Sequence, residues 1–224
     1  MRESITSDAA PEGVGVHAQK FSDAVREGTA VDSTMPTPEE VGARAKRIYE
    51  AFRADPEFRA FKAATLAHLT RWQCFGGPVL VSNWDLVLDR ESLFREAVRA
   101  LVLKSAVCEL TGGDERAAEI AISDPVDEMV HASLAQQQVL ERICTRQEFQ
   151  VIHQTDQESN DYREGDYTSK CYYVAFGRQP VARFWLDAEV VASRKQELAA
   201  LFKTIGIRDL GEKHDIVFAD TVAA

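Results

Sequence analysis

The sequence predicts a mainly α-helical protein, with a single domain of about six helices after a disordered N-terminal tail. Apolar side chains recur every three or four residues along several long stretches, which is the periodicity of an amphipathic helix. Residues typical of helix starts and ends flank these stretches. A length of 224 residues with 45% hydrophobic and 28% charged residues is typical of one globular domain.

The ordered domain is expected to span residues 37–224. Residues 1–36 are rich in Ser, Thr, Gly, Asp and Pro and carry few large apolar side chains, so we expect a mobile tail there. Thr37 is suited to cap a helix and Pro38 to occupy its first position. The apolar stripe of this first helix comprises Val41, Ala45, Ile48 and Phe52.

Two further helices are expected before residue 112. The first begins after Asp55-Pro56-Glu57, and its apolar stripe comprises Phe58, Phe61, Leu69 and Trp72. Gly76-Gly77-Pro78 ends it, and the short apolar run Val79–Leu88 fits either a strand or a buried loop. Residues 91–111 form the next predicted helix, which ends at Gly112-Gly113.

Ser123-Asp124-Pro125 predicts the start of a helix that continues to about Cys144. The following segment fits two structures. Aromatic and β-branched residues favour strands near 149–155, 170–176 and 181–186, which gives an α+β alternative with a small antiparallel sheet in residues 149–186. Periodicity instead favours a helix from Tyr162 to Phe176 that ends at Gly177. A last helix is expected over Asp187–Lys203, and Ile216–Phe218 fits a short strand or a docked tail.

The composition argues against several classes of protein. A net charge of −10 disfavours binding to nucleic acid through the overall field. No apolar run approaches the length of a membrane span, and the N-terminus lacks the pattern of a signal peptide. The four cysteines are irregularly spaced, which favours reduced thiols and a cytoplasmic location. The expected partner is therefore a small molecule or another protein.

The segment from Val126 to His153 carries the candidate site. Asp127 and His131 are four residues apart, so their side chains lie on one face of a helix. The carboxylate can fix the tautomer of the histidine, or both groups can bind one metal ion. If the chain turns back after Cys144, His153 approaches them. Two nitrogens and one carboxylate suit zinc or non-haem iron.

Other constellations are weaker. Glu128 and His131 have the ExxH spacing of di-iron bundles, but the sequence holds no second copy. At about 100° per residue, Cys144 points away from the face of His131, which favours a core position. Tyr172 and Trp185 belong to an aromatic group that is suited to line a ligand pocket.

The segment around Asp127 resembles the proteins similar to plant glycine-rich-domain proteins, a family with many bacterial members. Its members carry a VDxxWHxHxL-type segment, then a cysteine and a pair of histidines. The matching positions here are Val126, Asp127, His131, Leu134, Cys144 and His153, followed downstream by Thr168, Tyr172, Phe176, Gly177, Pro180 and Trp185. Val130, Ser133 and Gln154 replace the tryptophan and two histidines of the family. The resemblance covers residues 90–186 and implies a helix over Tyr162–Phe176.

We expect a soluble helical binding or interaction protein, because no catalytic signature is complete. The first alternative is a metal-dependent enzyme, with zinc or non-haem iron, that acts on a small molecule through Asp127, His131 and His153. The second is a metal-free tailoring enzyme that uses a tyrosine and histidine pocket for acid–base chemistry.

Overall fold

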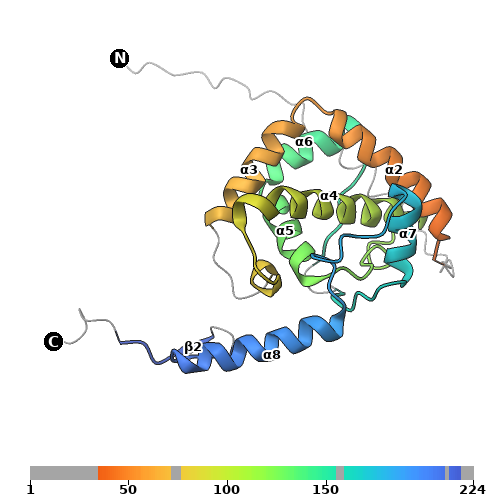
Figure 1. Ribbon diagram of the computed structural model, residues 1–224. Coiled ribbons are helices and arrows are strands. Elements are labelled where there is room, and N and C mark those ends of the chain that lie inside the picture. Colours follow the sequence, from red (N-terminus) through yellow and green to blue (C-terminus); the bar gives the residue numbers. More distant parts are fainter. Residues whose placement is uncertain (1–34, 72–76, 155–158, 210–211, 218–224) are drawn as a thin grey trace, which may run out of the picture. The chain divides into compact units, whose positions relative to one another are not determined.

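The fold is mainly helical, as the periodicity predicts. The computed structural model describes residues 35–71, 77–154, 159–209 and 212–217, so the prediction of a mobile tail over 1–36 lies almost wholly outside the described residues. These residues contain seven α-helices, a 3₁₀ turn and a two-stranded hairpin (Figure 1). The helices are α2 Pro38–Ala54, α3 Phe58–Arg71, α4 Leu86–Leu110, α5 Asp124–Leu134, α6 Gln137–Gln147, α7 Tyr167–Phe176 and α8 Ala188–Thr204. The 3₁₀ turn η2 spans Gly77–Leu80, and the strands are β1 Ile207–Arg208 and β2 Lys213–His214.

The expected start of the first helix is confirmed in detail. The side chain of Thr37 accepts a hydrogen bond from the backbone N–H of Glu40, and the Glu40 carboxylate accepts one from the Thr37 backbone N–H. This reciprocal capping box satisfies donors that the first helical turn leaves unpaired. The predicted stripe of α2 is buried, so the helix packs on the core through those residues.

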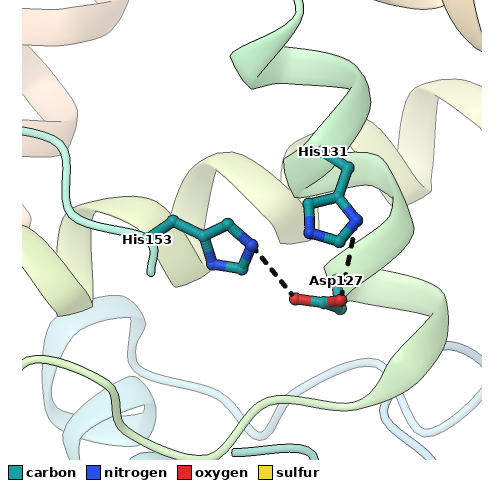
Figure 2. A group of neighbouring side chains, drawn as sticks. All are labelled: Asp127, His131 and His153. Carbon is teal, nitrogen blue, oxygen red and sulfur yellow. Dashed lines mark ion pairs between the residues drawn. The ribbon is translucent and has the colours of Figure 1, made fainter. Parts of the chain in front are cut away.

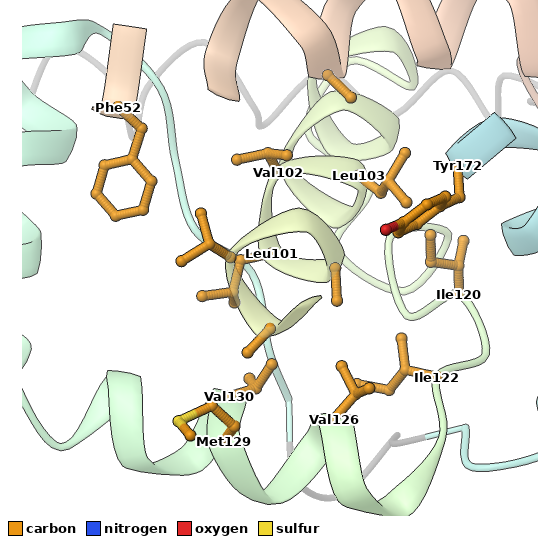
Figure 3. Packing of buried hydrophobic residues seen from close by; sticks show 14 of the residues in the cluster. Phe52, Leu101, Val102, Leu103, Ile120, Ile122, Val126, Met129, Val130 and Tyr172 are labelled. Carbon is orange, nitrogen blue, oxygen red and sulfur yellow. The ribbon is translucent and has the colours of Figure 1, made fainter. Parts of the chain in front are cut away.

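Helix α4 is the centre of the core. It contacts α2, α3, α5 and α7, and nearly every side chain from Leu93 to Cys108 is buried. Figure 3 shows apolar residues of α4 packed against side chains from α2, α5 and α7. The helix begins earlier than the predicted residue 91, because the Asp85 carboxylate accepts hydrogen bonds from the N–H groups of Val87 and Leu88.

The prediction of one helix from Ser123 to Cys144 is wrong, because the chain forms α5 and α6 with a break at Ala135-Gln136. No glycine or proline marks this break, which is why the pattern does not reveal it. Helix α5 packs on α4, α3 and η2, whereas α6 packs on α2, α3 and α5. The change of direction lets both helices cover the core.

The α+β alternative is also wrong for this region. Residues 149–154 and 159–186 contain no strand, and α7 occupies most of the stretch that periodicity assigns to a helix. The Asp166 side chain caps the start of α7 by accepting from the N–H of Ser169, and Gly177 ends the helix at a φ of 66°. Tertiary packing of these aromatic residues overrides their strand propensity.

The C-terminal part packs through a second, smaller apolar cluster of Leu80, Leu186 and Val191, with Leu198 against it. The predicted last helix is confirmed as α8. Ile216 and Val217 lie outside β2, and Phe218 is not among the described residues. Within the described part of the chain, no helix combines the length and the apolar character needed to cross a membrane.

Candidate metal centre

Asp127, His131 and His153 meet in one place, as the sequence predicts (Figure 2). His131 Nδ1 lies 3.9 Å from Asp127 Oδ2, and His153 Nε2 lies 3.7 Å from Asp127 Oδ1. The two imidazole rings are 4.8 Å apart between centroids and stand edge to face at 63°. Each carboxylate oxygen therefore faces a different imidazole.

Helix α5 positions the first two of these side chains. Its start is fixed to the segment before α8: the Ser123 hydroxyl donates to the carbonyl of Leu186, and the Leu186 N–H donates to the hydroxyl. The helix then places Asp127 in its first turn and His131 one turn later, on the same face. The helical spacing thus aims both side chains towards the segment that carries His153.

A chain reversal after α6 brings His153 back to α5. Glu148 adopts a left-handed conformation with a φ of 54°, and the Phe149 N–H donates to the carbonyl of Cys144. The segment is then anchored by the Gln154 N–H, which donates to Glu119 Oε1 at 2.6 Å. The turn that the sequence analysis required for a shared site is therefore present.

The three side chains can hold one metal ion. One donor atom from each residue lies within 4.8 Å of the others, whereas donors around a tetrahedral zinc ion are about 3.3 Å apart. The widest separation allowed by the 4.8 Å limit exceeds this value by about 1.5 Å, so the side chains would have to rotate towards one another to hold an ion. Within the residues that the structure describes, no other group of this kind occurs.

The three side chains are unequally buried. The His153 side chain is 0% exposed and that of Asp127 8%, whereas that of His131 is 26% exposed. Burial, helped by the nearby Lys104 and His131, lowers the pKa of His153 to about 3. The ring is therefore neutral at physiological pH, as a metal ligand must be.

Two buried charged residues lie on the side of His153 away from Asp127. The sequence analysis did not single them out. The Lys104 ammonium forms an ion pair with Glu119, and Lys104 Nζ lies 3.2 Å from His153 Nδ1. Lys104 is 0% exposed. The sequence does mark Lys104 as unusual, because it is the single lysine within the apolar run Leu101–Val107. Nothing in the pattern points to Glu119.

The contact with Lys104 sets the tautomer of His153. An ammonium group can only donate, so the Nδ1 atom that it faces must accept. The proton of a neutral ring then sits on Nε2, the atom that faces Asp127. A metal ion that binds Nε2 must move this proton to Nδ1, against the ammonium group. Lys104 therefore opposes metal binding through this atom.

The weaker candidates fall outside the centre. Glu128 is not part of the three-residue group, and its side chain lies over Gly77 instead. Cys144 is half-buried at the edge of the core, where burial raises its thiol pKa to about 11. This position agrees with the expectation that Cys144 serves packing.

Tyr172 and Trp185 lie in the core beside a buried carboxylate. The Tyr172 hydroxyl donates to Glu96 Oε2 at 2.6 Å, and the indole N–H of Trp185 donates to the same oxygen at 3.0 Å. Burial and the Glu96 charge raise the pKa of Tyr172. Trp185 also lines a cavity of about 260 Å³, and Tyr172 does not. Ligand binding by these two residues stays a prediction.

No protein-family model, curated protein or solved structure is significantly similar to this chain. The resemblance to the glycine-rich-domain family therefore stays a prediction.

Proposed function

We propose that the protein binds one divalent transition-metal ion through Asp127, His131 and His153. The observation that carries the proposal is the convergence of two imidazoles and a carboxylate from segments 22 residues apart. Two nitrogens and one carboxylate oxygen suit zinc and non-haem iron(II). The His131 side chain, 26% exposed, is the most solvent-accessible member of the group.

Such an ion would allow catalysis on a small molecule. Zinc would supply Lewis-acid chemistry and iron(II) would supply oxidative chemistry. The protein then supplies the neutral imidazoles and the partly enclosed site. Elemental analysis of the purified protein distinguishes zinc from iron.

Zinc titration of the metal-stripped protein, followed by competition with a chromophoric chelator, tests this proposal. We expect one zinc ion per chain in the wild type. His131→Ala should weaken binding by at least about a hundredfold, because it removes one of three protein ligands. His214→Ala removes an exposed histidine of β2 and is the matched control. Equal zinc affinity in the wild type and His131→Ala would exclude the site.

A second function is favoured by the contact between Lys104 and His153. This contact leaves the proton on His153 Nε2, next to Asp127, without any metal. The more exposed His131 would then act as a general acid or base towards a small substrate, with Asp127 orienting it. This function predicts no metal binding but a loss of activity in both His131→Ala and Asp127→Asn.

The remaining possibility is that the protein is a binding or interaction protein without catalytic activity. Metal binding together with turnover of a substrate would exclude this possibility. A protein without metal and without turnover would support it.

A further inference from the structure

A cleft between α2, α3 and α4 has a lining unlike that of the metal centre. It encloses about 440 Å³, within the range of small-molecule sites, and none of its lining residues belongs to the metal centre. Four cationic side chains line it: Arg53, Lys62, Arg95 and Arg99. Glu91 is the one acidic residue in the lining, and it is paired with Lys62 at 2.8 Å.

The charge of this cleft is opposite to that of the protein. The chain carries a net charge of −10, so its overall field repels anions. In the described part of the chain, neither Arg53 nor Arg95 forms an ion pair, whereas arginines such as Arg142, Arg146 and Arg183 are paired with carboxylates. Two guanidinium groups are therefore available to an anion in the cleft.

The remaining lining is aromatic and apolar. The guanidinium groups of Arg53 and Arg99 lie 5.4 and 5.8 Å from the centroid of the Tyr49 ring. Phe94 and Val98 are almost fully buried, and Phe58 lies 6.1 Å from Phe94 between ring centroids. The partly exposed rings of Tyr49 and Phe58 offer a surface on which a planar or apolar group can lie.

We infer that this cleft binds a small organic anion with a planar apolar body, such as an aryl phosphate. The anionic group would contact Arg53 and Arg95, and the ring would lie against the aromatic side chains. Arg99 holds the wall in place, because it donates to Glu96 at 2.8 Å and to the Tyr172 hydroxyl at 2.7 Å. The inference does not depend on the metal centre.

Calorimetric titration with phenyl phosphate, inorganic phosphate and benzyl alcohol tests the inference. We expect phenyl phosphate to bind with a Kd below about 1 mM and at least about tenfold more tightly than either other probe. Raising sodium chloride from about 50 mM to about 500 mM should weaken binding, because the contacts are partly exposed charges.

Matched variants locate the site. Arg53→Gln and Arg95→Gln should each weaken binding about tenfold, because each removes a charge-assisted hydrogen bond. Arg47→Gln removes an exposed arginine of α2 outside the cleft and should leave the Kd unchanged, as should His131→Ala at the metal centre. The inference is overturned if phenyl phosphate does not saturate the protein, or if Arg47→Gln weakens binding as much as the cleft variants.

Discussion

Lys104 is the residue whose position most sharply constrains the chemistry of the candidate metal centre. It is fully buried, paired with Glu119, and in contact with the imidazole nitrogen of His153 that faces away from Asp127. In most metal sites that nitrogen donates to a carboxylate, a carbonyl or a water molecule. Here the neighbouring group is the ammonium of Lys104, which can only donate. Substitution of Lys104, which would not touch the metal, therefore tests the proposal of metal binding.

Replacing the buried ion pair by neutral amides should tighten zinc binding. In the double variant Lys104→Gln/Glu119→Gln, an amide oxygen can accept the Nδ1 proton that metal binding places on His153. We expect the zinc Kd to fall about tenfold in a chelator competition, which is the size of such outer-shell effects. Lys195→Gln, which removes the lysine paired with Asp124 at the start of α5, is the control and should leave the Kd unchanged. Weaker zinc binding in the double variant would show that Lys104 supports the metal.

At this scale the sequence identifies the three candidate ligands but not what surrounds them. Asp127 and His131 follow from helical spacing, and His153 follows from the expected chain reversal. The contact between Lys104 and His153 joins residues 49 positions apart. It depends on how α4 packs, which local patterns do not encode.

At the scale of elements, the corner between α2 and α3 is tied to α6 by a buried carboxylate. Asp55 accepts hydrogen bonds from the Arg146 guanidinium, with oxygen–nitrogen distances of 2.8 and 3.1 Å, and from Gln147 at 3.0 Å. Its side chain is 0% exposed. These bonds, chiefly the one from Arg146, lower the pKa of Asp55 from 3.8 to about 2.

Acid should therefore weaken this corner. A carboxyl group with a lowered folded-state pKa stabilises the fold above its unfolded pKa of 3.8, and this contribution is lost as the pH falls towards 2. Asp55→Asn should lower the free energy of unfolding by about 1–2 kcal/mol at pH 7. It should also reduce the loss of stability between pH 4 and pH 2, as measured by urea unfolding.

The control for Asp55 is Asp215→Asn, which breaks an exposed pair with Arg208. Exposed pairs contribute little, so its unfolding curves should match those of the wild type at every pH. The explanation fails if Asp55→Asn leaves the pH dependence of stability unchanged.

The packing of η2 against α5 requires a glycine at position 77. Gly77 has a φ of 57°, and a Cβ atom there would lie 2.0 Å from Cγ of Glu128. We expect Gly77→Ala to lower the free energy of unfolding by about 2–3 kcal/mol, through backbone strain and displacement of Glu128. Gly112→Ala meets no atom within 4 Å at a φ of 72°, so it should cost only about 1 kcal/mol. Equal losses in the two variants, measured by urea unfolding, would contradict this packing argument.

Elements could be predicted where a local signal defines them. The cap at Thr37 and the left-handed Gly177 mark helix ends that the structure bears out. The break at Ala135-Gln136 carries no such signal, because it arises from the different packing partners of α5 and α6. The strands expected in residues 149–186 fail for a similar reason, since aromatic side chains there pack into a helical core.

On the scale of the whole molecule, α4 is the common support of both candidate sites. Arg95 and Arg99, near its middle, line the cleft between α2, α3 and α4, and Lys104 further along contacts His153 of the candidate metal centre. The mainly helical class follows from periodicity alone. The placement of the two sites does not, because each collects side chains from helices distant in sequence.

Metal content of the purified chain tests the central claim most directly. The protein is expressed with added zinc and iron, purified without chelators, and measured by elemental analysis beside Asp127→Asn and His131→Ala. We predict close to one zinc or iron ion per wild-type chain and strongly reduced metal in both variants. No bound metal in the wild type, or equal metal in all three proteins, would contradict the account.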